Sequence, residues 1–263
     1  DLTFLNGLFS LNYTYSRQNV KDQIFDVPLD TSTGYSALVT NGGSIHTNSH
    51  ELTIGVNPIN TKNVKWDFAV NYSKIDNYVD ELAPGVNSIM LGGFVEPQVR
   101  AGIGDKFPVI NGMPQAGEEK VIGTVSPDFR IGFNTTFEFY KFRLSAVIDW
   151  KQGGQMYAGT AGMLDYYGVS KKSADFRKSE SFLFEKDAVK VAGTDASGNP
   201  IYEKNDIRIS GANAQAYFSG LSDISESLIF DNSYIKLREI ALSYPVLAKH
   251  NLGVTLNLFA RNI

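Results

Sequence analysis

The histidines are the residues of this sequence best able to bind a metal ion or to act as a catalytic base, and there are three of them. His46 and His50 lie four residues apart. On a β-strand this spacing corresponds to about 13 Å, too far for one metal ion to bind both unless a loop folds between them. His250 lies in a short predicted turn, and a hydrolytic triad would need one of these histidines as its base. We expect all three to be ordinary polar residues.

Motifs that carry known chemistry are scarce in the rest of the chain. The sequence contains no G-x-S-x-G, P-loop or zincin motif. It also contains no cysteine for a thiol nucleophile or a zinc thiolate. Asp195–Asn199 resembles a calcium loop but lacks the glutamate that closes an EF-hand loop; a turn at Gly198–Asn199 before Pro200 explains this segment better. The sequence therefore predicts a protein that is not an enzyme and has no cofactor or metal site.

The elements that must position any site are β-strands, most clearly the pair within Phe129–Trp150. Alternate residues there are apolar, many of them aromatic, and the residues between them are mainly small or polar. A period of two indicates a strand, and about ten residues is the length of a tilted strand that crosses a bilayer. Apolar residues towards lipid, polar residues towards a lumen and aromatic residues at strand ends are typical of a transmembrane barrel. The charged residues predicted to face the lumen are Arg130, Glu138, Arg143, Asp149 and Lys151.

Short and long connections alternate along the chain, as in outer-membrane barrels with short periplasmic turns and long extracellular loops. A phase slip near Arg238–Glu239 within one strand indicates a β-bulge. Seven strands and a stub at residues 1–5 are too few to close a transmembrane barrel, so we expect the chain to be a piece of a longer protein. The predicted short turns are Asn6–Gly7, Pro58–Asn63, Tyr140–Lys141 and Pro245–Asn251, and the long loops are about 18–48, 75–128 and 152–230.

Composition argues against other classes of protein. The chain has 263 residues, a formal net charge of −4 and no basic stripe, so nucleic-acid binding is not expected. No apolar run reaches the roughly 18 residues of a transmembrane helix, so in a membrane this sequence must form closed β-structure. The alternative is a soluble or surface β-rich protein, such as a carbohydrate-binding sandwich, in which the same apolar faces would form a protein core.

Four stretches of the sequence resemble the C-terminal barrel of the SusC/RagA family of TonB-dependent transporters. The resemblance implies an all-β fold: an antiparallel transmembrane β-barrel segment of a barrel of about 22 strands, in the bacterial outer membrane. Residues 1–263 would be a partial barrel, with the plug domain and the final strands outside this sequence. The stretches are residues 8–29 (LFSLNYTYSRQNVKDQIFDVPL), 122–157 (from IGTVSPDFRIGF to DWKQGGQMY), 230–246 (FDNSYIKLREIALSYPV) and 252–263 (LGVTLNLFARNI).

The resemblance also implies a function, the active import of nutrients such as oligosaccharides or peptides. A SusD-like surface lipoprotein would form a lid over the long loops, and TonB would act through an N-terminal region outside this sequence. The family's acidic, calcium-type stretch is replaced here by INGMPQAGEEK at residues 110–120, so no metal is assigned to it. Aromatic residues of the longest loop are candidates for contact with the ligand or lid, the alternative being that they pack the loop itself; they are Tyr166, Tyr167, Phe182 and Phe184.

Overall fold

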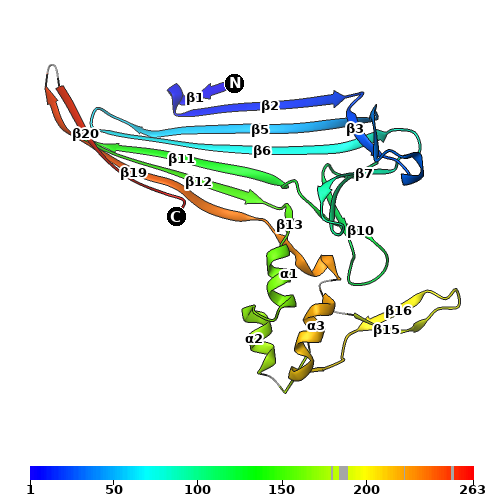
Figure 1. The fold of residues 1–263 in the computed structure, drawn as a ribbon. Helices are drawn as coiled ribbons and strands as arrows, with labels where there is room; N and C mark the ends of the chain where they lie inside the picture. Colours follow the sequence, from blue (N-terminus) through cyan, green and yellow to red (C-terminus); the bar gives the residue numbers. More distant parts are fainter. Residues whose placement is uncertain (179, 184–188, 222, 250–251) are drawn as a thin grey trace.

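The computed structural model describes residues 1–263 except 179, 184–188, 222 and 250–251. Its main element is an eight-stranded sheet in which every strand pairs antiparallel with its neighbours (Figure 1). The sheet confirms the predicted all-β, antiparallel fold. From one edge to the other its strands are β1 (Leu2–Phe4), β2 (Phe9–Val20), β5 (Gly43–Asn60), β6 (Val64–Leu82), β11 (Phe129–Phe139), β12 (Phe142–Gln152), β19 (Tyr234–Lys249) and β20 (Leu252–Arg261).

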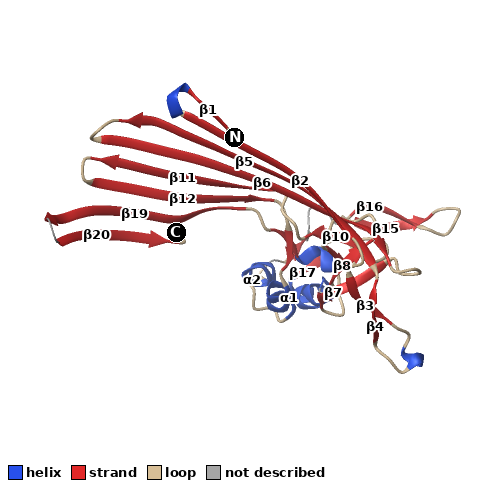
Figure 2. Ribbon diagram, turned by 90° about the horizontal axis from the view of Figure 1, so that it is seen from above, coloured by secondary structure: helices blue, strands red, loops and turns tan. Residues whose placement is uncertain are grey.

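Short turns join the strands at one end of the sheet, and the long connections leave from the other end (Figure 2). The turn between β11 and β12 is tight because Tyr140 adopts the left-handed conformation, with φ 52°. The amide of Tyr140 donates to the carbonyl of Asn63, 2.7 Å away, which ties this turn to the neighbouring turn between β5 and β6. We call the long connections at the other end, residues 21–42, 83–128 and 153–233, the loop layer.

Four strands are longer than the sequence predicted; one of them is β19, which continues to Lys249 and so takes in most of the predicted turn Pro245–Asn251. β2 continues to Val20, β5 begins at Gly43 and β6 continues to Leu82, so the loops expected at about 18–48 and 75–128 are shorter. Beyond the apolar stretch the strands carry polar residues on both faces. The alternation that predicts a strand is lost there, whereas the backbone ladder continues.

The predicted β-bulge is present in β19. Val147 of β12 pairs with Glu239 and the next residue, Ile148, pairs with Leu237, so Arg238 is the extra residue. The bulge explains why the apolar residues of β19 change phase while staying on one face of the sheet.

The first two loops contain short strands that pair within the loop. A hairpin fills residues 21–42, and a four-stranded sheet fills most of residues 83–128. The elements are β3 (Ile24–Pro28), η2 (Thr31–Thr33), β4 (Ala37–Asn41), β7 (Ser88–Gly93), β8 (Gln98–Gly102), β9 (Val109–Gly112) and β10 (Lys120–Thr124); η1 (Leu5–Gly7) precedes β2.

In the third loop three helices lie together beyond the loop end of the sheet (Figure 1). Ser170 caps the second helix by accepting a hydrogen bond from the amide of Ser173. Helices of seven or eight residues complete about two turns, too few to establish a helical period in the sequence. The elements are β13 (Gln155–Tyr157), α1 (Gly159–Tyr166), α2 (Lys171–Arg177), β14 (Ser181–Phe182), β15 (Val189–Thr194), β16 (Pro200–Lys204), β17 (Ile209–Ser210), η3 (Gly211–Asn213), α3 (Ala214–Leu221), η4 (Ser225–Leu228) and β18 (Ile229–Asp231).

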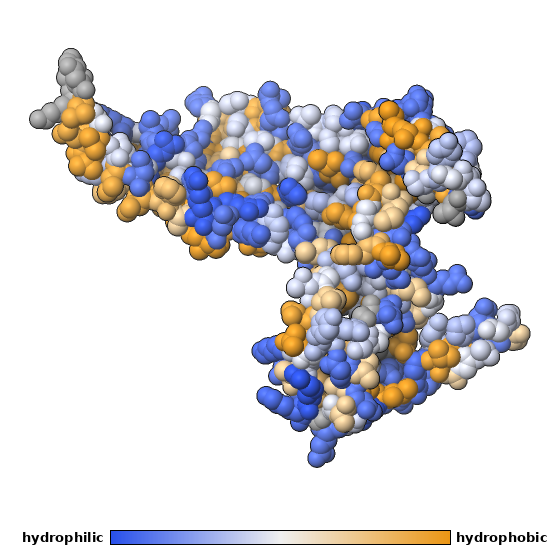
Figure 3. All heavy atoms as spheres, in the orientation of Figure 1, coloured by the Kyte–Doolittle hydropathy of each residue, from blue (hydrophilic) through white to orange (hydrophobic). Residues whose placement is uncertain are grey.

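Buried apolar side chains gather in the loop layer and at the adjoining ends of β5 and β6. The apolar face of the main sheet contributes none of those identified as core; instead, apolar residues lie at the molecular surface along the sheet (Figure 3). All ten residues of β20 are exposed. Within the described residues, no helix is long and apolar enough to cross a membrane. The buried apolar residues are Val27, Ile45, Val79, Ile89, Ala101, Val109, Ile110, Phe182, Ala214, Phe218 and Leu228.

Candidate binding site in the loop layer

The third loop leaves the sheet through a glycine pair that sets its direction. Gly153 and Gly154 both have positive φ, 74° and 76°, a conformation that glycine adopts without steric cost. A Cβ on Gly154 would lie 2.8 Å from the carbonyl oxygen of Val125, so a larger residue would push the loop away from its neighbour. The amide of Gly153 also donates to the Ser233 hydroxyl, 2.7 Å away. The start and the end of the loop are thus fastened together.

Two glutamates join the second and third loops to each other. Oε1 of Glu96 accepts hydrogen bonds from the amide of Met113 and the hydroxyl of the buried Ser225, both at 2.6 Å. Glu226 accepts from the amide of Gln115 at 2.7 Å, and its own amide donates to the carbonyl of Met113 at 3.1 Å. Hydrogen bonds to an ionised carboxylate are stronger than neutral ones. The two loops therefore form one connected unit.

An aromatic groove opens between these loops. Its volume is about 640 Å³. The rings of Phe94 and Tyr157 meet edge to face at 6.0 Å, and those of Tyr166 and Tyr167 at 5.1 Å. Val95 lies at the rim with 93% of its surface exposed. We call this the aromatic groove; its lining residues are Phe94, Val95, Glu96, Tyr157, Gly159, Gly162, Met163, Tyr166, Tyr167 and Leu228.

The groove combines apolar surface with a few polar groups. Burial raises the pKa of the Tyr157 hydroxyl, and the nearby Glu96 carboxylate raises it further, so this hydroxyl stays protonated and able to donate at neutral pH. The side-chain amide of Gln215 donates to the carbonyl of Tyr166 and so fixes the end of α1. Aromatic faces with a few hydrogen-bonding groups suit sugar rings and the side chains of peptides alike.

The sequence singled out four aromatic residues, and the structure separates them. Tyr166 and Tyr167 line the groove, with Tyr167 64% exposed. Phe182 is only 5% exposed and packs in the cluster around Phe218, which favours the alternative that it packs the loop. Phe184 lies outside the described residues. Sequence reasoning missed Phe94 and Val95, which follow a strand of the second loop and reach the groove only through contacts between the loops.

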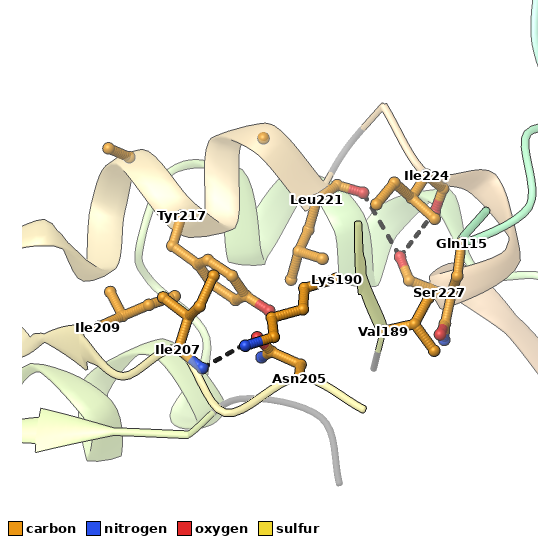
Figure 4. Close-up of a pocket in the computed structure, with 12 residues that line it drawn as sticks. Gln115, Val189, Lys190, Asn205, Ile207, Ile209, Tyr217, Leu221, Ile224 and Ser227 are labelled. Carbon is orange, nitrogen blue, oxygen red and sulfur yellow. Dashed lines mark hydrogen bonds between the residues drawn. The ribbon is translucent and has the colours of Figure 1, made fainter. Parts of the chain in front are cut away.

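A second cavity, of about 420 Å³, lies beside α3 (Figure 4). Two of its polar side chains, those of Ser227 and Lys190, already have partners. The Ser227 hydroxyl donates to the carbonyl of Ile224 at 2.7 Å. Lys190 pairs with Asp206 at 2.6 Å and with Glu203 at 3.0 Å. The hydroxyl of Ser227 and the ammonium of Lys190 are thus engaged within the loop, and we assign no site there.

The five charged residues predicted to face a lumen share one face of the sheet. Arg130 and Lys151 pair in register, as do Glu138 and Arg143, whose side chains lie 3.8 Å apart. Asp149, two residues before Lys151 on β12, lies on the same face.

Asp149 is the centre of a polar cluster on that face. It accepts hydrogen bonds from Arg238 at 2.6 and 3.0 Å and from the Tyr234 hydroxyl at 3.1 Å. The ammonium of Lys236 lies 4.2 Å from the centroid of the Tyr234 ring. Lys151 is buried beside this group, with its Nζ 5.6 Å from the same ring centroid. Sequence reasoning left Tyr234, Lys236 and Arg238 out, although the predicted bulge was a signal that Arg238 could be redirected.

The remaining residues considered for chemistry have local partners. His46 Nδ1 lies 2.6 Å from Asp80, and His50 Nδ1 lies 2.8 Å from the Tyr13 hydroxyl. His250 lies outside the described residues. Asp195 accepts hydrogen bonds from the amides of Ser197 and Asn199 and from the Asn199 side chain, as expected for a turn. In the part of the chain that the structure describes, no three His, Asp or Glu side chains are grouped to hold a metal ion.

We compared the sequence with family models and with curated proteins. No family model matches the sequence. Two curated proteins of Formosa agariphila are similar: TonB-dependent receptor P3, 20% identical over 93% of this chain and 26% of its own length, and TonB-dependent receptor P26, 24% identical over 89% of this chain and 25% of its own length. The chain spans about a quarter of each of these relatives.

Solved structures give the same result for the fold. The RagAB peptide importer in its closed-closed state superimposes with a TM-score of 0.65 and 14% identity, over 98% of this chain and 30% of that chain. A structure of the RagAB peptide transporter gives a TM-score of 0.64, with 16% identity, over 98% of this chain and 29% of that chain.

The fold is therefore that of part of the β-barrel of an outer-membrane TonB-dependent transporter. The resemblance to the SusC/RagA type of these transporters is confirmed, and so is the predicted bacterial outer-membrane location.

Proposed function

We propose that this chain forms part of the wall and of the extracellular loop layer of a TonB-dependent active transporter that imports nutrients such as oligosaccharides or peptides. The observation that carries the proposal is that apolar side chains are buried in the loop layer but exposed on the main sheet. The loops have a protein core, whereas the apolar face of the sheet has none among the described residues. A soluble sandwich would need a second sheet over that face, but lipid covers it in a barrel.

The apolar face has the height and the borders of a membrane band. β11 spans about 34 Å from Phe129 to Phe139 at the usual rise per residue, or about 26 Å of membrane thickness when tilted by about 40°. Aromatic rings meet near both borders. At the loop end Phe129 lies 5.9 Å from Tyr72 and 5.4 Å from Trp150. At the turn end Phe142 lies 4.6 Å from Tyr244. Barrels carry such aromatic girdles at both interfaces.

The aromatic groove is our candidate for contact with the ligand or lid. Tyr166 and Tyr167, supported by Phe94 and Val95, present exposed aromatic surface at the loop end. Large aromatic side chains are enriched at the centres of protein interfaces and in sugar sites. The partner that covers the groove would be a SusD-like surface lipoprotein, and the ligand a glycan or a peptide. Phe182 is left out because it is buried.

The polar face of the sheet would line the lumen. Asp149 is hydrogen-bonded to Tyr234 and Arg238, and Arg130 and Lys151 lie on the same face, so the surface is mostly cationic and would fit either a plug domain or a passing anionic group. TonB would couple energy through a region outside this sequence. No covalent chemistry is assigned to the chain.

Site-specific photo-crosslinking in the intact protein tests the role of the groove. A photoreactive amino acid at Tyr167, which is 64% exposed, should crosslink to a lid lipoprotein or to a peptide or glycan substrate. The matched control is Tyr140, which is 68% exposed at the turn end of the sheet and should give neither product. Equal crosslinking at both positions, or crosslinking at Tyr140 alone, would contradict the assignment.

A further inference from the structure

The apolar face of the sheet changes character abruptly near the loop layer. β2, β5 and β6 continue past the band, and their side chains stay on the same face. Leu52 pairs with Tyr72, and in the next row on that face His50 pairs with Lys74. On β2, Tyr13 and Tyr15 face these two rows, and Arg17 follows one step further. The step from apolar to cationic residues marks the level at which a lipid chain ends and its headgroup begins.

A shallow pocket lies at this step. Its volume is about 640 Å³, and it is lined by Tyr13, Tyr15, Arg17, Asn48, His50 and Asp76. The Tyr15 ring lies 5.0 Å from the His50 ring, and the Tyr15 hydroxyl donates to the Asn48 side chain at 3.3 Å. The Tyr13–His50 hydrogen bond described above fixes the imidazole. The floor of the pocket is thus an ordered aromatic surface from two strands, β2 and β5.

Arg17 gives the pocket an exposed positive charge. Among the described residues, no carboxylate lies within ion-pair distance of Arg17, which is exposed. Asp76 is shared by Lys74 at 3.3 Å and Lys106 at 3.5 Å, so these three side chains together keep one positive charge. Guanidinium groups bind phosphate with paired hydrogen bonds, and Arg17 is free to do so.

We propose that this pocket binds the phosphate-bearing headgroup of a lipid of the outer leaflet, with its acyl chains lying along the apolar face beside Tyr13 and Leu52. This inference rests on the proposed function, because it requires the sheet to stand in the outer membrane. The cationic rim is continuous with the apolar band on one face. A lipid satisfies both surfaces at once, whereas a free anion would use only the rim.

Binding of lipid A, a diphosphorylated glycolipid, to the intact protein in detergent tests the proposal. Native mass spectrometry over a lipid titration reports how much lipid stays bound. Arg17→Gln should weaken binding about tenfold, which corresponds to about 1.4 kcal/mol, because it removes one charge-assisted contact. Arg17→Lys should retain part of the affinity. Lys141→Gln, which removes an exposed cation from the turn at the other end of the sheet, should leave lipid binding within about twofold of the unaltered protein.

Three results would overturn the proposal. The first is equal binding of lipid A by the unaltered protein and Arg17→Gln. The second is an equal loss in Lys141→Gln, which would show an effect of net charge alone. The third is displacement of the lipid by inorganic phosphate at a similar concentration, which would show a site for any phosphate. These failures leave the membrane assignment intact, because spin-label accessibility of the apolar face tests that assignment separately.

Discussion

The main sheet and the loop layer are built for different surroundings, although they belong to one chain. In the sheet the large apolar residues lie on the surface, as Phe137, Leu144 and Leu258 do. In the loop layer Phe218 and Ile89 are almost fully buried. The loops thus follow the rule for proteins in water, with apolar residues inside, and the sheet follows the rule for barrels in lipid, with apolar residues outside. The position of the apolar residues, more than their number, identifies the solvent of each part.

The largest expected effect comes from the core of the loop layer. Phe218→Ala removes a ring that packs against Phe176 and Tyr217, and it should destabilise the third loop by about 3–5 kcal/mol. Limited proteolysis of the intact protein should then cut within residues 153–233 while the sheet remains resistant. Phe137→Ala, on the apolar face of β11, is the matched control and should leave this loop protected. Equal protection in both variants would contradict the separate loop core.

A charge on the apolar face should have the next largest effect. Phe133→Arg places a guanidinium at the middle of the band and should destabilise the folded protein in lipid by about 2–4 kcal/mol. Asn134→Arg, one residue along on the polar face, should have a much smaller effect. Urea unfolding in lipid vesicles measures both. Similar losses for the two variants would mean that the two faces do not meet different solvents.

Removing the hydrogen bonds that join the second and third loops should have a moderate effect on stability. Glu96→Ala removes the acceptor for the amide of Met113 and the hydroxyl of Ser225, and it should destabilise the contact by about 1–3 kcal/mol. Hydrogen exchange of the Met113 amide should become faster. Glu118→Ala, an exposed residue of the same loop, should leave that amide unchanged. If both variants leave the exchange rate unchanged, the loops are held together by other contacts.

The smallest effect concerns the hairpin of β15 and β16. Hydrogen bonds, first from the Asn199 side chain and then from backbone amides, hold the pKa of Asp195 below its ordinary value. A lowered pKa stabilises the turn above the ordinary value, near pH 4, and this contribution is lost as the pH falls through the folded-state pKa. Amides of residues 189–204 should therefore exchange faster than expected below about pH 4. Asp195→Asn should remove this pH dependence, and its persistence in that variant would assign it to another group.

The sequence predicted the sheet better than the loop layer, for a physical reason. Each strand of the band meets lipid on one face and a polar surface on the other, so its residues alternate strictly, and even the bulge at Arg238 left a visible phase slip. The loop layer depends on contacts between distant segments, such as the bond from Ser225 to Glu96, 129 residues away. Its helices are too short to leave a period. Tyr166 and Tyr167 could be selected from the sequence, but Phe94 and Val95 could not.

Spin labels at neighbouring positions of the sheet test the central claim most directly. Labels are placed at Phe133 and Leu144, on the apolar face, and at Asn134 and Ser145, on the polar face, in the intact protein reconstituted into lipid. We predict that the labels at Phe133 and Leu144 are accessible to oxygen dissolved in the bilayer and shielded from a water-soluble nickel complex. The labels at Asn134 and Ser145 should be much less accessible to oxygen than those at Phe133 and Leu144. Shielding of Phe133 and Leu144 from both reagents would place them in a protein core, and access by the nickel complex would place them in water; either result would contradict the account.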